Sequence, residues 1–272
     1  MRVACVQLNS RDDKAANVAA AAELVRRAAA AGARLVALPE TWTYKGSHSR
    51  LAGEAEDIDG PSNKVLVGLA RELGVYVLAG SLYELTEQAG HYYNTSVLFD
   101  PAGEPLAVYR KLHLFDAVSG TKVYRESDDQ LPGDELVVAE VDGVKVGLSI
   151  CYDLRFPELY RALALHGARI VLVPSAFTEH TGRDHWEVLL RARAIENGCF
   201  VVAPDQWGVH GEGRLCHGRS MIVDPWGTVL ARAADGVGWC DAELDLEAVD
   251  RVRGQLPALR HRRPELYDSW EA

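Results

Sequence analysis

The chain has few cysteines, and their placement argues against a disulfide framework or a zinc site. They are odd in number, far apart in the 272 residues, and contain no C-x-x-C pair: Cys5, Cys151, Cys199, Cys216 and Cys240. Zinc sites and redox pairs need closely spaced cysteine or histidine ligands or a resolving partner. We therefore expect no bound metal, no cofactor and a reducing, cytoplasmic location.

Membrane and nucleic-acid signals are also missing. No apolar run approaches the ~18 residues that a membrane-spanning helix needs, and the first residues, MRVACVQLNS, do not resemble a secretory signal. The 39 acidic residues outnumber the 29 Lys and Arg, which gives a formal net charge of −10 with no basic stripe. This balance argues against a nucleic-acid partner, but it leaves room for a small anion bound by local cations in a pocket.

Composition and spacing predict one α/β domain over residues 1–272. Hydrophobic residues make up 48% and charged residues 25%, which is ordinary for a globular protein with a large core. No Pro/Gly/Ser-rich linker breaks the middle, and strand-like runs alternate with helical ones. The expected helices are 14–31, 62–73, 156–166 and 184–197. The expected strands are 3–8, 34–38, 75–84, 94–99, 106–111, 136–141, 144–150, 170–173, 200–203, 220–223 and 229–232.

A weak internal repeat indicates how these elements are layered. Ser96–Leu106 matches Ser220–Leu230 at an offset of 124 residues, and Val77–Ala79 matches Val201–Ala203 at the same offset. The alternative is the coincidence of a common hairpin turn. If the repeat is real, each half builds one sheet with helices on its outer face. The two sheets then pack face to face in an α-β-β-α sandwich.

The most informative feature is the segment around Cys151. The apolar run Val144–Ile150 stops abruptly at this cysteine, and the helical spacing that follows has Pro157 in its first turn. A cysteine on a sharp strand-to-helix turn lies at the sheet edge near backbone N–H groups, which can lower the pKa of a thiol and bind an oxyanion. Considered alone, Cys151 fits a buried structural cysteine better than a nucleophile, because free cysteines are among the most buried residues.

Two other buried strands end in chemically useful residues. The run Leu35–Leu38 ends in Pro39 and then Glu40, and the strand that includes Tyr109 ends at Lys111. A carboxylate, an ammonium and a thiol at one sheet edge form the minimum set for acyl transfer through a thioester. Alone, Glu40 is compatible with a solvated loop or a helix cap, and Lys111 with a surface lysine.

These motifs make the chain resemble the nitrilase, or carbon–nitrogen hydrolase, superfamily, whose catalytic set is Glu–Lys–Cys. The resemblance runs from Val3–Leu8 to His261–Tyr267. It implies a four-layer α-β-β-α sandwich of the nitrilase type. It also implies that Glu40 is the base, Lys111 stabilises the oxyanion and Cys151 is the nucleophile.

The resemblance suggests three further site residues. Glu126 matches a second glutamate that positions the lysine or the substrate, although its acidic stretch is also typical of a solvated loop. The backbone N–H of Tyr152 is expected to assist Lys111 at the oxyanion. Arg155 is expected to bind a substrate carboxylate with its forked guanidinium, and the alternative is a structural ion pair with Glu158 or Asp153.

Two further expectations concern the chemistry of the site. Burial beside Leu38 and Pro39 is expected to raise the pKa of Glu40 toward the useful range for a base. A Cys–His hydrolase would need His113 or His185, and we rank that alternative below Glu–Lys–Cys. A binding protein of the same fold that lacks activity is the other alternative.

Three segments, 111–116, 155–159 and 185–196, most closely resemble those of the Nit subgroup of amidases. This resemblance implies hydrolysis of a small 2-oxo-acid amide by water. The last two segments, together with 224–227 and 261–264, favour the deaminated glutathione amidases over the omega-amidases, which act on 2-oxoglutaramate. The same triad also hydrolyses nitriles and transfers acyl groups, and loops such as 42–50, 115–126 and 177–183 are expected to decide between these reactions. The tail from about residue 254 to 272 has no periodic helix or strand, and we expect it to pack on a neighbouring subunit of a homodimer.

Overall fold

The structure is a computed structural model in which residues 1–267 are described. The chain begins with two β-α-β units. The strands β1 (Arg2–Gln7), β2 (Leu35–Ala37) and β3 (Tyr76–Leu78) pair in parallel, and the helices α1 (Lys14–Ala30) and α2 (Pro61–Leu73) connect them. Local signals set the helix ends. The Asp13 carboxylate accepts a hydrogen bond from the Ala16 N–H at 2.9 Å, and Gly74 ends α2 at φ 65°.

The first sheet has eight strands and the second has six. The first follows the order β18-β1-β2-β3-β5-β4, and its strands β6 and β9 also pair with β5. Its remaining strands are β4 (Leu82–Leu85), β5 (Tyr92–Phe99), β6 (Pro105–Arg110), β9 (Gln130–Leu131) and β18 (Gly238–Glu243). The second is β10 (Val138–Val141), β11 (Val144–Leu148), β12 (Ile170–Leu172), β13 (Phe200–Ala203), β16 (Met221–Val223) and β17 (Val229–Arg232), paired in that order.

Both sheets contain the same motif, which supports the repeat seen in the sequence. In the first sheet three parallel strands, β1, β2 and β3, are followed by the antiparallel pair β5–β6. In the second, β11, β12 and β13 are parallel and are followed by the antiparallel pair β16–β17. Each half of the chain therefore builds one copy of the same layer.

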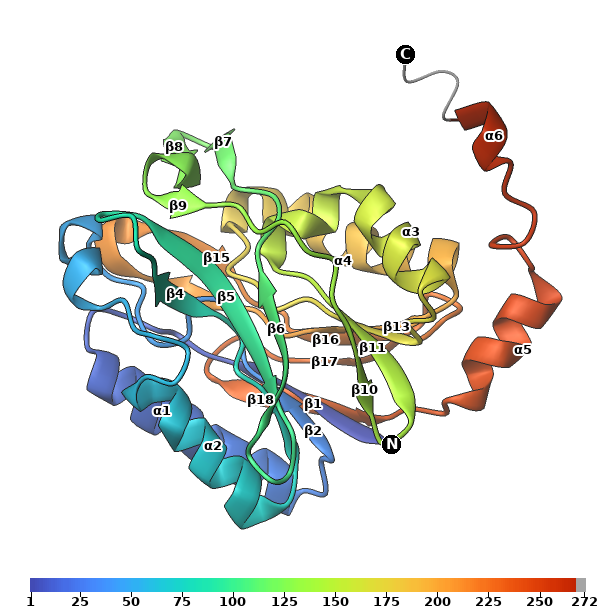
Figure 1. Cartoon of the computed structure of the whole chain (residues 1–272), viewed down its shortest axis with the longest axis horizontal. Helices are drawn as coiled ribbons and strands as arrows, with labels where there is room; N and C mark the ends of the chain where they lie inside the picture. The colour runs from blue at the N-terminus through green and yellow to red at the C-terminus, as the bar shows by residue number, and fades with distance from the viewer. Residues whose placement is uncertain (268–272) are drawn as a thin grey trace.

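The layers stack as the sequence predicts. Side chains of both sheets, among them Val3 and Leu35 of the first and Val146 and Ile170 of the second, form one buried apolar cluster between them. Two other clusters lie outside, one under α1 and α2 and one under α3 (Pro157–Leu165) and α4 (Glu179–Asn197). Figure 1 shows the four layers, with a helix pair on each outer side. The expected α-β-β-α sandwich is confirmed. The shared core supports a single domain, which stays a prediction.

Several element boundaries differ from the expectation. The expected strand 75–84 is two strands, because the chain bends at Gly80, where φ is 41° and an added Cβ would lie 1.9 Å from the Pro39 carbonyl oxygen. The helix α4 begins at Glu179 rather than near residue 184. Several strands were not predicted. They are β9, β18 and two small hairpins with strands of only three or four residues: β7 (Asp116–Ser119) with β8 (Lys122–Arg125), and β14 (Trp207–Val209) with β15 (Leu215–His217).

The C-terminal segment is more ordered than expected. The helices α5 (Glu247–Gln255) and α6 (Pro264–Tyr267) contradict the expectation of a tail without a helix. Figure 1 shows this segment leading away from the sandwich. Residues 268–272 of the expected tail lie outside the described residues. Within residues 1–267 no helix is long and apolar enough to cross a membrane.

Short 3-10 helices occur in the loops. They are η1 (His48–Gly53), η2 (Glu126–Asp128), η3 (Cys151–Arg155) and η4 (Gly211–Gly213). Two of them carry candidate site residues, Glu126 in η2 and Cys151 in η3.

Candidate active site

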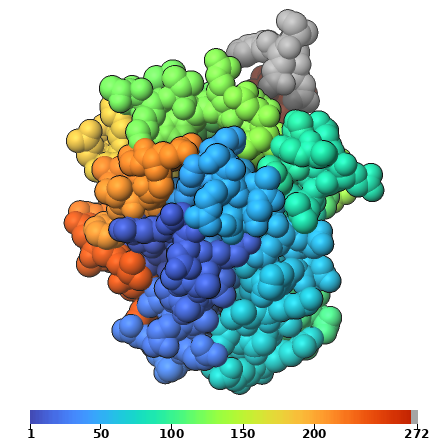
Figure 2. Space-filling model, turned by 90° about the vertical axis from the view of Figure 1, so that its left-hand side faces the viewer, coloured from blue at the N-terminus to red at the C-terminus, as the bar shows by residue number. Residues whose placement is uncertain are grey.

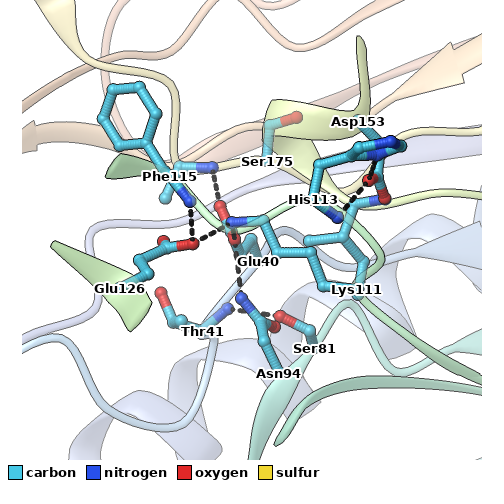
Figure 3. A network of polar contacts seen from close by, with 12 residues as sticks. Glu40, Thr41, Ser81, Asn94, Lys111, His113, Phe115, Glu126, Asp153 and Ser175 are labelled. Atoms are coloured by element: carbon cyan, nitrogen blue, oxygen red, sulfur yellow. Dashed lines mark hydrogen bonds and ion pairs between the residues drawn. The ribbon is translucent and has the colours of Figure 1, made fainter. Parts of the chain in front are cut away.

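Three strand ends bring the predicted residues together between the two sheets. Glu40 follows β2, Lys111 follows β6 and Cys151 follows β11. The Lys111 Nζ lies 3.0 Å from Glu40 Oε1 and 2.8 Å from Glu126 Oε2 (Figure 3). Glu40, Glu126 and Cys151 all line one cavity of about 130 Å³. The structure therefore places all four catalytic candidates in one site.

Cys151 lies on a sharp turn, as its sequence context predicts. Its φ is 45°, in the left-handed region that non-glycine residues rarely adopt. Its N–H donates to the Pro174 carbonyl at 3.0 Å, and the Asp153 carboxylate accepts from the Ile150 N–H at 2.8 Å. These bonds hold the turn in place. Because the Cys151 N–H is already bound, it is not free to bind an oxyanion.

Glu40 is almost fully buried, yet all its interactions stabilise the charged form. Its Oε1 accepts from Lys111 and also from Asn94 Nδ2 at 2.8 Å, and its Oε2 accepts from the Ala176 N–H at 2.8 Å. Sequence reasoning missed Asn94. Asn94 is one of three consecutive polar residues in β5, so its sequence context does not single it out. Its backbone carbonyl also accepts from the Lys111 N–H at 2.9 Å.

The expected rise in the pKa of Glu40 is wrong. Burial does raise the pKa of this carboxyl. The positive charges of Lys111 and Lys45 and hydrogen bonds from Cys151 and Lys111 lower it by more than burial raises it. The pKa of Glu40 therefore lies below its ordinary value. The sequence showed the apolar residues Leu38 and Pro39 but not the cations that the fold adds. Glu40 is consequently ionised in the resting site.

The thiol of Cys151 behaves in the opposite way. Burial and the negative charge of Glu40 raise its pKa well above the ordinary value, and the nearby Lys111 and the Ala176 N–H only partly oppose them. A backbone N–H does lower this pKa, as expected, but burial and Glu40 outweigh it, so the net shift in the resting site is upward. The resting pair is a protonated thiol within hydrogen-bonding reach of an ionised carboxylate.

Lys111 is buried between two carboxylates. Burial alone would lower its pKa, but Glu126 and Glu40 raise it well above the ordinary value, so the ammonium is permanently charged. Glu126 is itself held by the Phe115 N–H, which donates to Oε2 at 2.8 Å. The alternatives of a surface lysine and a solvated Glu126 do not fit this geometry.

Arg155 lines the cavity without a carboxylate partner among residues 1–267. Its guanidinium carbon lies 5.2 Å from the ring centre of Phe177, and its Nη1 is 3.3 Å from His185 Nδ1. The expected structural alternatives, Glu158 and Asp153, do not pair with it. Asp153 instead accepts from Tyr109 Oη at 2.6 Å. The guanidinium is thus available to a substrate anion.

The aromatic wall contains Tyr152, and the histidines lie outside it. The Tyr152 ring packs on Phe115 at 4.9 Å and on Phe156 at 5.3 Å. His113 stacks on Phe156 at 3.6 Å, and its Nδ1 lies 2.7 Å from an Asp153 oxygen. Neither His113 nor His185 lines the cavity. The geometry therefore does not favour a Cys–His pair.

The cavity rim comes from four segments. Residues from each of the three expected loops line it, and β15 adds Leu215 and Cys216, which sequence reasoning missed. Figure 2 shows the segment after Glu40 (blue), the β7–β8 hairpin (green) and the β14–β15 hairpin (orange) side by side on one face. The lining cations are Lys45, Arg125, Arg155 and Arg214. Among residues 1–267 no group of His, Cys, Asp and Glu gathers in a way that could hold a metal ion.

Comparisons with known proteins agree with this geometry. The carbon–nitrogen hydrolase family model matches residues 2–254. The deaminated glutathione amidase of Synechocystis sp. is 44% identical over 263 residues, which are 95% of this chain and 97% of that protein. The human omega-amidase is 38% identical over 267 residues, or 98% and 96%. The crystal structure of the C. elegans NitFhit protein superposes with a TM-score of 0.93 at 39% identity, and it covers 98% of this chain, which spans 66% of the C. elegans protein.

Replacing the nucleophile tests the site directly. We expect Cys151→Ala to lower amide turnover by at least ~10⁴-fold, because the proposed nucleophile that forms the thioester is removed. Stability should change by only about 1 kcal/mol, since one sulfur atom is lost from a turn. Steady-state kinetics and thermal unfolding measure both effects. Cys199→Ala is the matched control and should retain turnover. Labelling of Cys199 instead of Cys151 by an electrophilic amide would show that Cys199 is the nucleophile and contradict the prediction.

A second variant tests the buried ammonium. We expect Lys111→Arg to fail almost as badly as Lys111→Ala, with a loss of ~10²–10³ in kcat, because a planar guanidinium does not fit between Glu40 and Glu126. Single-turnover kinetics on folded protein gives the comparison. Turnover within about threefold of wild type would show that Lys111 does not bind the oxyanion.

Proposed function

The chain belongs to the carbon–nitrogen hydrolase family, and we propose that it hydrolyses a small 2-oxo-acid amide, preferably deaminated glutathione, through a thioester on Cys151. The observation that carries this proposal is the buried Lys111 ammonium between Glu40 and Glu126, beside a protonated thiol. Arg155, unpaired in the same cavity, supplies a site for the carboxylate of the substrate.

Bond formation and proton transfer are coupled in the first step. Glu40 takes the proton of the Cys151 thiol while the sulfur attacks the amide carbon. The carbonyl oxygen becomes an oxyanion, which Lys111 and the backbone N–H of Tyr152 stabilise. The negative charge on Glu40 thus disappears as a negative charge forms on the oxyanion. The Lys111 ammonium, which also pairs with Glu126, therefore keeps the same number of anionic neighbours during this step. This exchange explains how a carboxylate of low pKa deprotonates a thiol of high pKa.

The same carboxyl completes the reaction. Glu40 gives the proton to the amide nitrogen, the C–N bond breaks, and the amine leaves a thioester on Cys151. Glu40 then takes a proton from a water molecule, whose oxygen adds to the thioester carbon. The C–S bond breaks, the acid product forms, and the proton returns to the sulfur. Glu126 keeps the Lys111 ammonium in place during both halves.

The relatives support an acyl group derived from a 2-oxo acid. Deaminated glutathione is 2-oxoglutarate joined through its distal carboxyl to cysteinylglycine, and 2-oxoglutaramate is the same acyl group joined to ammonia. Identity to the Synechocystis deaminated glutathione amidase, 44%, exceeds identity to the human omega-amidase, 38%. Deaminated glutathione is therefore the first candidate, and 2-oxoglutaramate is the alternative.

The assembly and location that we propose are a homodimer in the cytoplasm. All five cysteines are free, which fits a reducing compartment. A groove lined by residues of α4, the turn between β16 and β17, and α5 exposes apolar side chains. Ile195 is 53% exposed, Trp226 57% and Leu256 58%. A second copy that covers this groove would remove these side chains from water.

Substrate preference is tested by following 2-oxoglutarate, the product of both amides. We expect deaminated glutathione to have the higher kcat/KM. Arg155→Lys should lower kcat/KM for either 2-oxo amide at least ~10-fold more than for a neutral amide of similar size, because a bidentate ion pair is lost. Equal losses of kcat/KM on charged and neutral amides would show that Arg155 does not bind the substrate carboxylate. A higher kcat/KM for 2-oxoglutaramate than for deaminated glutathione would favour the omega-amidase assignment.

Light scattering at micromolar concentration tests the assembly. We expect about twice the chain mass of 29.8 kDa. Leu256→Glu should shift the protein toward monomer because it places a charge on the proposed interface, whereas Leu85→Glu, on the exposed edge strand β4, should not. A wild-type monomer would contradict the proposal.

A further inference from the structure

The catalytic cavity contains a second lysine that the mechanism does not use. Lys45 follows the base Glu40 by five residues, lines the cavity and is half-buried. Other half-buried cations of the chain have a carboxylate partner: Lys14 pairs with Glu56 at 2.7 Å, and Arg169 with Asp250 at 2.7 Å. Among residues 1–267 the Lys45 ammonium has neither an ion pair nor a hydrogen bond to an acceptor.

Lys45 nevertheless carries a charge. Burial lowers its pKa, but Cys216, Tyr83 and Glu40 together raise it above the ordinary value. Of these three groups only Glu40 is ionised at neutral pH, because burial raises the pKa of Cys216 and of Tyr83 to about 12. A half-buried cation without an anionic partner carries a desolvation free energy that a bound anionic ligand would offset.

Lys45 and Arg155 come from different walls of the cavity. Arg155 belongs to η3, the turn that begins with Cys151, and lies against Phe177. Lys45 lies in the segment that follows Glu40, and its backbone carbonyl accepts from the N–H of Gly211, in the loop of the β14–β15 hairpin, at 3.1 Å. The cavity thus has a cation on the wall that carries the nucleophile and another on the wall that continues from the base.

The chemistry of amide cleavage gives these two walls a direction. The carboxyl that protonates the departing nitrogen must lie beside that nitrogen, so the amine half of the substrate extends past Glu40. The acyl chain leaves the carbonyl carbon in the other direction, toward the turn that carries Arg155. Arg214 also lines the cavity, next to β15, and its positive charge lowers the pKa of Lys45. It already pairs with Glu212 at 3.1 Å. Arg125 also lines the cavity without an ion pair among residues 1–267, but it is exposed to solvent, whereas Lys45 is half-buried.

We propose that Lys45 binds a carboxylate on the amine half of the substrate. This inference rests on the proposed function and refines it: the cavity selects an amide with a negative group on each side of the scissile bond. Deaminated glutathione has this pattern, because its glycine carboxylate belongs to the leaving dipeptide. 2-Oxoglutaramate does not, because its leaving group is ammonia. Lys45 would then be the residue that separates the two activities.

The experiment compares three substrates that share one acyl group. They are deaminated glutathione, its C-terminal amide, in which the glycine carboxylate is neutral, and 2-oxoglutaramate. We expect wild type to prefer the free carboxylate over the C-terminal amide by at least ~10-fold in kcat/KM, the contribution of one charged hydrogen bond. Lys45→Met should abolish this preference, whereas Lys45→Arg should retain part of it. Lys64→Met, which removes an exposed lysine on α2, is the control for lost charge and should keep the wild-type preference.

The alternative role of Lys45 is to act only through the pKa of Glu40. In that case Lys45→Met would lower kcat/KM equally for all three substrates and shift the acid limb of the pH profile, and the proposal would be wrong. Failure of the proposed function looks different: wild type would hydrolyse none of the three 2-oxo amides. The same comparison of free carboxylate with C-terminal amide, made with the acyl group that wild type does hydrolyse, would then decide the role of Lys45.

Discussion

The buried ammonium of Lys111 is the constraint on which the site depends. A cation with 1% of its side chain exposed needs anionic partners, and Glu40 and Glu126 provide them at 3.0 and 2.8 Å. The two carboxylates are in turn held by backbone N–H groups of Ala176 and Phe115. Moving any of these groups would leave a buried charge without a partner, so the charge network and the chain around it stabilise each other.

The double-sheet fold supplies this network because each proposed catalytic group follows the end of a strand. Glu40 and Lys111 come from the first sheet and Cys151 from the second, and the apolar cluster between the sheets holds both in fixed register. The strained backbone of Cys151 is maintained by the Pro174 carbonyl and the Asp153 carboxylate. The relative positions of the site residues therefore depend on the apolar packing between the two sheets.

Local charge and total charge have different consequences in this protein. The chain is acidic overall, with a net charge of −10, yet cations line the cavity. Total charge argues against a nucleic-acid partner, while the pocket favours a small anion. The positions of Arg155 and Lys45 on different walls of the cavity turn that general preference into a specific expectation about where the substrate carries its charges.

The sequence alone predicted the main strands and helices of the two layers, the repeat and the three strand ends of the proposed catalytic residues, because periodicity and strand-terminal polar residues are local properties. It did not predict β18 or the short hairpins. Tertiary structure decided what depends on distance. Burial near Leu38 suggested a raised pKa for Glu40, but Lys111 and Lys45 reverse that shift only after the chain folds. Asn94 is a strand residue like many others until β5 places its amide 2.8 Å from Glu40. Electrostatic energies depend on separations between residues far apart in the chain, and no sequence pattern contains those separations.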